Sequence, residues 1–195
     1  VFLSLFAGIG GFDRALELAG FRCAGQVEID RFGRKILRER FPHARLWRDV
    51  RRFRRKQAGR LVRALWADEQ EGRADIPRDR DSATSDRELH RAAGRIDLLV
   101  GGFPCQDLSV AGKRAGLSGS RSALFYEIVR IAKALTPTWG LFENVPGLLS
   151  SHGGRDMGLV LEGLRECWPA VGYRVQDSRY FGVAQRRPSV FFVCG

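Results

Sequence analysis

The chain has 195 residues and a formal net charge of +11, with 44% hydrophobic and 28% charged residues. This length indicates one globular domain that can bury a sizeable core. No apolar run approaches the roughly 18 residues of a transmembrane helix, and the apolar opening has neither a basic leader nor a cleavage site. We therefore expect no membrane span and no signal peptide.

The positive charge is carried almost entirely by arginine. Of the 33 basic residues, only four are lysines, which leaves 29 arginines. A basic surface favours a polyanionic partner such as nucleic acid, and arginine suits phosphates and base edges. A genome that is rich in arginine codons would produce the same composition, so charge alone leaves both explanations open.

Cysteine usage indicates a reducing, intracellular compartment. The four cysteines form no C-x-x-C pair and the three histidines are scattered, so we expect no metal site. Three cysteines, Cys23, Cys167 and Cys194, lie in apolar or helix-like contexts and are interpreted as packing residues.

Periodicity predicts strands alternating with helices along the chain. Apolar runs bounded by turn residues predict strands at 1–6, 25–30, 46–50, 96–100, 139–142, 173–175 and 190–193. Apolar residues at helical spacing predict helices over 12–19, 31–41, 122–135 and 159–168. This alternation is typical of an α/β fold with a doubly wound, mostly parallel sheet.

One segment departs from that pattern. Residues 51–56 form a basic run, and residues 66–95 are rich in Asp, Glu, Arg, Ser and Gly with little apolar periodicity. We expect 66–95 to be a solvated, mobile insertion within a single domain spanning 1–195. Contact of the basic run with nucleic acid is the alternative interpretation.

The first half of the chain predicts a cofactor site. A glycine turn at 7–11 joins the first strand to the first helix, and Glu28 follows Gly8 by 20 residues, the spacing of a nucleoside site. The turn lacks the complete G-x-G-x-x-G pattern that binds pyrophosphate. This favours S-adenosylmethionine, with Asp49 accepting from its adenine amino group. A nicotinamide dinucleotide and a purely structural turn remain alternatives.

The second half is organised around the segment 99–106, in which a buried strand runs into Gly101 and Gly102. Pro104 and Cys105 follow directly, at the strand edge where α/β proteins hold their ligands. A thiol there is either an inert packing group or a nucleophile that the proline holds in one direction.

The order of the motifs favours the second interpretation. Four segments and two single acids occur in one order along the chain, namely 6–11, Glu28, Asp49, 102–106, 143–145 and 185–187. This series resembles that of DNA cytosine-5 methyltransferases and covers nearly the whole chain apart from the insertion. The resemblance implies a Rossmann-like, S-adenosylmethionine-dependent fold and methyl transfer to carbon 5 of cytosine through a covalent Cys105 adduct.

The resemblance also implies a role for each matching residue. The catalytic residues would be Cys105, Glu143 and Arg187. The cofactor would contact Phe6, Gly8, Gly10, Gly11, Glu28, Asp49, Pro104 and Leu124. The substrate side would comprise Gln106, Ser109, Asn144 and Gln185, with Asn144 bracing the Pro-Cys loop. Structural roles as turn residues are the alternative for Glu143 and Asn144.

The chemistry explains these residue types. Carbon 5 of cytosine is a poor nucleophile until a thiolate adds to carbon 6, and cysteine supplies some thiolate near neutral pH. Arg187 nearby would raise that fraction. Glu143 would share a proton with ring nitrogen 3 during the attack.

Three departures from the family limit what the chain is expected to do alone. Ser189 stands where a second arginine usually follows Arg187, and the target-recognition region and the final motif are absent. We therefore expect a fragment of a cytoplasmic bacterial or phage protein of the restriction-modification type. It would act on double-stranded DNA with a flipped cytosine, with a partner chain carrying the recognition region. An RNA cytosine methyltransferase and an inactive or split binding subunit are the alternatives.

Overall fold

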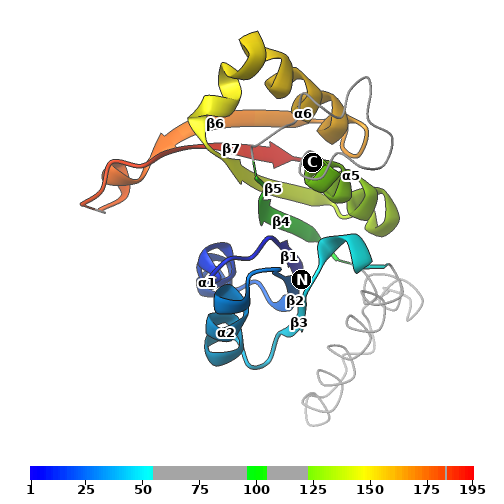
Figure 1. Cartoon of the computed structure of the whole chain (residues 1–195), viewed down its shortest axis with the longest axis vertical. Helices are drawn as coiled ribbons and strands as arrows, with labels where there is room; N and C mark the ends of the chain where they lie inside the picture. Colours follow the sequence, from blue (N-terminus) through cyan, green and yellow to red (C-terminus); the bar gives the residue numbers. More distant parts are fainter. Residues whose placement is uncertain (55–95, 105–122, 183) are drawn as a thin grey trace, which may run out of the picture.

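The computed structural model describes residues 1–54, 96–104, 123–182 and 184–195. Its centre is a sheet of seven strands (Figure 1). The strands are β1 (Phe2–Leu5), β2 (Cys23–Val27), β3 (Arg45–Trp47), β4 (Leu98–Gly102), β5 (Trp139–Asn144), β6 (Val171–Asp177) and β7 (Pro188–Cys194). They lie in the order β3-β2-β1-β4-β5-β7-β6, and all neighbours are parallel except β7, which is antiparallel to β5 and β6. The predicted α/β fold with a mostly parallel sheet is confirmed.

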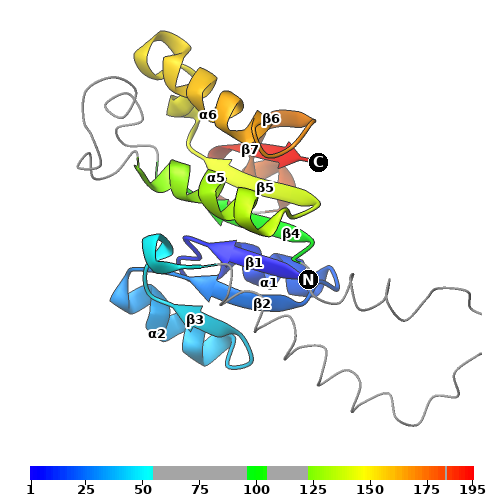
Figure 2. The same cartoon turned by 90° about the vertical axis from the view of Figure 1, so that its right-hand side faces the viewer.

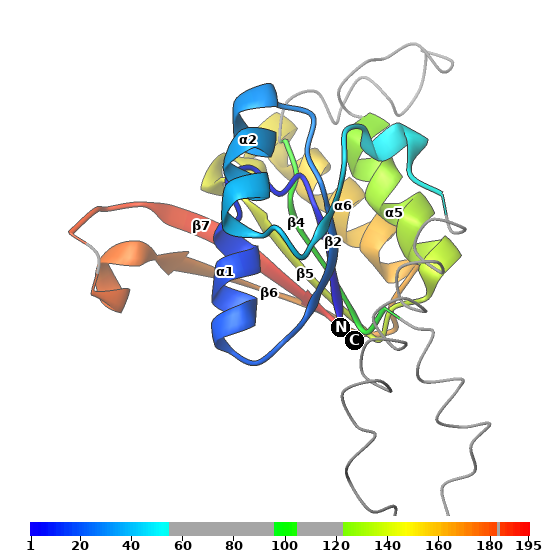
Figure 3. The same ribbon diagram turned by 90° about the horizontal axis from the view of Figure 1, so that it is seen from below.

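Helices cover both faces of this sheet. They are α1 (Gly11–Leu18), α2 (Arg31–Arg40), α5 (Ala123–Leu135) and α6 (Arg155–Arg165), with short 3-10 turns η3 (Pro146–Leu149) and η4 (Ser151–Gly154) before α6. Helices α1 and α2 lie on one face, and α5 and α6 lie on the other (Figures 2 and 3). Strands β1 and β4 are therefore buried on both sides, which explains their nearly continuous apolar sequence.

The side chains of each strand alternate between the two faces. In β1, Phe2 belongs to a small cluster with Leu16 of α1, whereas Leu3 and Leu5 belong to the larger cluster on the opposite face. Fully buried residues of α5, β5 and β7 such as Ile128, Phe142 and Phe192 also belong to the larger cluster. Each such side chain stabilises the fold by roughly 1.5–3 kcal/mol.

Tertiary pairing moved several predicted boundaries. The prediction that the fifth strand ends at 142 is wrong, because β7 extends β5 through the pair Asn144 and Val190. Helix α6 begins at Arg155, four residues before the predicted start and directly after two left-handed glycines. Strand β2 ends at Val27, so Glu28 lies just past it. The predicted insertion at 66–95 lies outside the described residues.

Strands β6 and β7 continue past the body of the sheet as a two-stranded ribbon that reaches beyond α1 (Figures 1 and 3). The connection begins with the 3-10 turn η5 (Ser178–Phe181). Asp177 closes its base, since Oδ1 accepts hydrogen bonds from the backbone N–H groups of Arg179 and Arg187. The ribbon therefore holds Arg187 at the edge of the sheet.

Three cysteines lie in the packed part of the domain. Burial raises the pKa of Cys194 to about 12 and also raises the pKa of Cys23 and of Cys167. These thiols are therefore protonated near neutral pH. In the described part of the chain, no helix is long and apolar enough to cross a membrane, and no group of His, Cys, Asp and Glu is arranged to hold a metal ion.

Candidate active site at the carboxyl edge of the sheet

The candidate site lies where the parallel strands end. Strands β3, β2, β1, β4 and β5 all point toward one edge, and the strand order reverses between β1 and β4. In open α/β sheets this reversal opens a crevice between the loops that leave the two strands. Most of the predicted site residues lie at or just past the ends of these strands.

The glycine turn after β1 is joined directly to Glu28. The backbone N–H of Gly8 donates to Glu28 Oε2 at 2.6 Å, and the N–H of Asp30 donates to Oε1 at 2.7 Å. Glu28 is buried, and no ion pair involving it is found among the described residues. Its carboxylate is held by backbone donors, and each carboxylate oxygen has a second lone pair with which it can accept from a ligand.

Close packing of α2 supports this arrangement. Asp30 caps the start of the helix, and its Oδ2 accepts from the N–H of Gly33 at 2.6 Å. A Cβ on Gly33 would lie 2.7 Å from the carbonyl oxygen of Gly8 and 3.2 Å from Glu28 Cγ. Gly33 therefore allows α2 to approach the turn.

The turn itself is strained and tightly packed. Phe6 and Gly8 both have positive φ, at 53° and 57°, and for Phe6 this left-handed conformation costs energy. Gly10 is buried, and a Cβ there would collide with the ring of Phe41. Gly10 thus serves packing against α2, whereas Gly11 is exposed at the first residue of α1.

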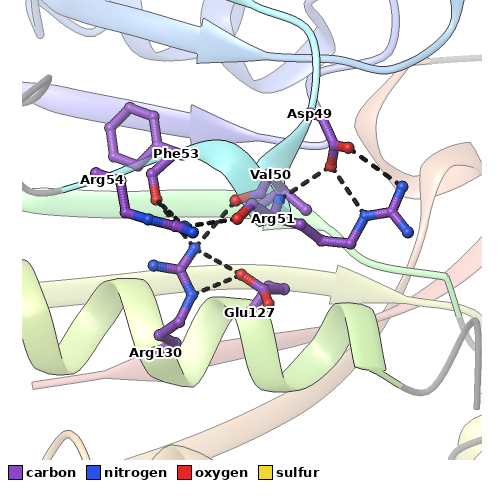
Figure 4. A network of polar contacts seen from close by, with 7 residues as sticks. All are labelled: Asp49, Val50, Arg51, Phe53, Arg54, Glu127 and Arg130. Atoms are coloured by element: carbon purple, nitrogen blue, oxygen red, sulfur yellow. Dashed lines mark hydrogen bonds and ion pairs between the residues drawn. The ribbon is translucent and has the colours of Figure 1, made fainter. Parts of the chain in front are cut away.

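Asp49 is occupied by a neighbouring arginine. It caps the 3-10 turn η1 (Val50–Arg52), and its carboxylate accepts from Arg51 Nε at 3.1 Å and from Nη2 at 3.2 Å (Figure 4). The hydrogen bonds from Arg51 lower the pKa of Asp49, although burial opposes the shift. An incoming adenine amino group would share or displace these bonds.

Helix α5 fixes the position of this turn. Arg130 donates through Nη2 to the carbonyl oxygens of Val50 and Phe53, each at 3.1 Å, while its Nε donates to Glu127 (Figure 4). Leu124, at the start of the same helix, is half-buried against the core. The loop after β3 is therefore anchored to α5, the helix that Arg130 belongs to.

Asn144 connects the ends of β4 and β5. Its Nδ2 donates to the carbonyl oxygen of Phe103 at 3.0 Å, and its Oδ1 accepts from the N–H of Val145 at 2.8 Å. Phe103 directly precedes Pro104, so Asn144 holds the backbone that leads to Cys105. Cys105 itself, with Gln106 and Ser109, lies outside the described residues.

Glu143, the other predicted acid, is held by a side chain. Ser189 Oγ donates to Glu143 Oε1 at 2.7 Å across strands β7 and β5. A Cβ on Gly102 would lie 3.1 Å from Oε2, so the second oxygen lies beside the end of β4. Glu143 thereby lies within the sheet next to the strand that leads to Cys105.

A cavity of about 530 Å³ lies between α1, the end of β5 and strands β6 and β7. Its wall includes the edge-to-face pair of Phe12 in α1 and Phe191 in β7, whose ring centroids are 6.3 Å apart. It is lined by Gly11, Phe12, Ala15, Glu143, Gln176, Ser178, Phe181, Arg187, Ser189 and Phe191. The structure therefore brings Gly11, Glu143 and Arg187 to one cavity, whereas Gln185 is exposed on the ribbon and does not line it. The other predicted cofactor residues also lie outside this lining, namely Phe6, Gly8, Gly10, Glu28, Asp49, Pro104 and Leu124.

Two features near the glycine turn, one polar and one apolar, were missed by sequence reasoning. Asp13, on the buried side of α1, accepts hydrogen bonds from Ser4 and from Gln26, and burial raises its pKa. An acid among the apolar positions of an amphipathic helix was the available signal. Ile29 is an exposed apolar side chain beside Glu28, and no pattern in the sequence distinguishes it.

The sheet order and the loops at its carboxyl edge define a Rossmann-like α/β protein. The family model for C-5 cytosine-specific DNA methylases matches residues 1–65 and 73–195. The chain therefore belongs to the C-5 cytosine-specific DNA methylase family, and the resemblance inferred from the motifs is confirmed.

Individual relatives agree with this assignment. The chain is 30% identical over 192 residues to the type II methyltransferase M.HgiBI of Herpetosiphon aurantiacus, and 30% identical over 195 residues to the type II methyltransferase M2.BsuMI of Bacillus subtilis. Each match covers 98% of this chain but only 36% and 41% of the respective relative. The chain thus spans about two fifths of the length of these curated relatives.

Solved structures support the fold. The crystal structure of the Dnmt2 methyltransferase of Schizosaccharomyces pombe matches 98% of this chain and 49% of its own, with a TM-score of 0.67 and 18% identity. At this identity the likeness concerns the fold alone.

Proposed function

We propose that this chain is the catalytic domain of an enzyme that transfers a methyl group from S-adenosylmethionine to carbon 5 of cytosine in DNA. The observation that carries the proposal is the cavity lined by Gly11, Glu143 and Arg187. Methyl transfer needs the methyl donor and the reacting base to be held side by side. This cavity has Gly11, at the end of the glycine turn, and the acid Glu143 in one wall.

Residues on the cofactor side fit a nucleoside ligand. Glu28 is a buried carboxylate whose two oxygens each accept one backbone N–H, and a carboxylate has lone pairs for further donors such as ribose hydroxyls. Phe6 and Asp49 would contact the adenine of this ligand. Its methionine side would contact Gly8, Gly10 and Gly11, and the remaining surface would contact Pro104 and Leu124. When bound, S-adenosylmethionine supplies an electrophilic methyl group on a sulfonium.

The residues of the base side would activate the cytosine. The thiolate of Cys105 would add to carbon 6, and Glu143 would give a proton to ring nitrogen 3, so that carbon 5 becomes nucleophilic. Arg187 would stabilise the thiolate and the developing charge. After the methyl group reaches carbon 5, loss of the carbon 5 proton would release Cys105.

The target cytosine would leave the duplex before this chemistry. Unstacking costs roughly a few kcal/mol and gives access to both faces of the ring. Asn144 would brace the Pro-Cys loop, while Gln106, Ser109 and Gln185 would contact the DNA. Residues beyond this chain, on the same polypeptide or on a partner chain, would read the target sequence.

The experiment is covalent trapping. The chain is incubated with S-adenosylmethionine and duplex DNA that contains 5-fluorocytosine, because fluorine cannot leave as the proton does and the adduct persists. We expect a DNA adduct that resists denaturation with the native chain and with Cys167→Ala, and none with Cys105→Ala. An adduct that survives Cys105→Ala would contradict the assigned nucleophile. Labelled methyl on tRNA but not on duplex DNA would contradict the DNA substrate.

A further inference from the structure

The hydrogen bond between Ser189 and Glu143 crosses two antiparallel strands. Glu143 pairs with Phe191, and Ser189 precedes Phe191 by two residues, so its side chain lies on the same face of β7 as that of Phe191. Ser189 is 7% exposed, and its Oγ lies 2.7 Å from Glu143 Oε1. The hydroxyl is therefore held in place by the ladder and directed at one oxygen of the acid.

The two oxygens of Glu143 have different surroundings. Oε1 accepts from Ser189. Oε2 lies close to Gly102, since a Cβ added to this glycine would lie only 3.1 Å from Oε2. Gly102 is the last residue of β4, three residues before Cys105. Within the described residues, no cation lies within 4.0 Å of either oxygen.

We infer that Ser189 is a positioning residue that assigns the two oxygens of Glu143 different tasks. It holds Oε1 as an acceptor, so that Oε2 carries the proton destined for the base. The inference rests on the proposed function and identifies Ser189 as the group that orients the catalytic acid Glu143. Among the described residues, the group that holds the acid is therefore a neutral hydroxyl.

The proton balance explains why this hydrogen bond aids the reaction. As the sulfur of Cys105 forms its bond to carbon 6, the electron pair of the ring double bond is displaced toward nitrogen 3, which takes the proton from Oε2. Glu143 then becomes a carboxylate, and the bond from Ser189 becomes charge-assisted, which is roughly twice as strong as a neutral one. An interaction that strengthens on the way to the transition state accelerates the chemical step without tightening substrate binding.

Three serine variants test this inference. Ser189→Ala removes the hydroxyl, Ser189→Thr keeps it, and Ser4→Ala is the control because Ser4 is another buried serine that donates to a carboxylate, that of Asp13. The readouts are the rate of adduct formation with 5-fluorocytosine DNA and the separate dissociation constants for DNA and for S-adenosylmethionine.

We expect Ser189→Ala to slow adduct formation about tenfold while both dissociation constants stay within about twofold. Ser189→Thr should restore most of the rate, and Ser4→Ala should leave it unchanged although it lowers the melting temperature. An unchanged rate in Ser189→Ala, or a Thr variant as slow as the Ala variant, would overturn the inference.

A second measurement separates this inference from the proposed function. If the native chain forms no adduct, the proposed activity of the chain fails, and Ser189 is tested by the carboxyl ¹³C resonance of Glu143, identified through Glu143→Gln. The resonance should move in Ser189→Ala and return in Ser189→Thr. A resonance that does not move in Ser189→Ala would show that Ser189 does not hold the acid.

Discussion

The two halves of the sheet edge hold their acids by different means. On the cofactor side, Glu28 accepts from the backbone N–H groups of Gly8 and Asp30. On the base side, Glu143 accepts from the hydroxyl of Ser189 on an antiparallel strand. Backbone donors depend on the path of the chain, whereas a side-chain donor depends on one residue. The cofactor half is therefore sensitive to packing, and the base half is sensitive to single side chains.

Loss of the Glu28 charge should give the largest effect. Glu28→Gln replaces one acceptor oxygen by an NH₂ group that faces a backbone N–H, so we expect affinity for S-adenosylmethionine to fall about 100-fold. Two donors that face each other, the new NH₂ group and the backbone N–H, should also lower the free energy of unfolding by about 2 kcal/mol. Calorimetric titration and urea unfolding measure the two effects. Glu17→Gln is the control, because the Glu17 carboxylate in α1 contacts His43 and not the glycine turn. A fall below threefold in Glu28→Gln would contradict the role of Glu28.

Packing beneath the turn should matter next. In Gly33→Ala the new Cβ lies 2.7 Å from the Gly8 carbonyl oxygen and pushes α2 away from Glu28. We expect about tenfold weaker cofactor binding and a loss of about 2 kcal/mol of stability from overpacking. Gly158→Ala in α6 meets open space, so it should instead stabilise the protein, by up to about 1 kcal/mol. Equal behaviour of the two variants would refute the packing argument.

The smallest effect concerns Asp49, whose pKa is lowered by Arg51. Because the folded pKa lies below the unfolded value of 3.8, the pair contributes stability above that pH and loses it as the pH falls through the folded value. The contribution is only roughly 0.5 kcal/mol, since Arg51 is exposed. Unfolding followed from pH 7 to pH 2 should therefore lose slightly less stability in Asp49→Asn than in the native chain. A larger loss of stability in Asp49→Asn than in the native chain would contradict a stabilising contribution from the ionised Asp49.

The sequence was sufficient to predict features that depend on local pattern. The spacing from Gly8 to Glu28 predicted a nucleoside site, and the structure joins these two residues by a hydrogen bond. Alternation of strands and helices predicted the fold class, because each periodicity reports which side of an element is buried. Strand ends were harder to predict. Glu143 and Asn144 were expected in a loop, but pairing with β7 places both within β5.

Contacts between distant residues required the tertiary structure. Ser189 and Glu143 are 46 residues apart, and only the insertion of β7 between β5 and β6 brings them together. The same holds for Gly10 against Phe41 and for Asp13 beneath the turn.

The sequence by itself therefore determined the fold class, the family and the order of the motifs along the edge, since these depend on spacing within the chain. Tertiary structure decided which oxygen of Glu143 is held, which glycine serves packing and which residues share the cavity. These outcomes depend on strand order and side-chain direction, and neither is encoded in local sequence periodicity.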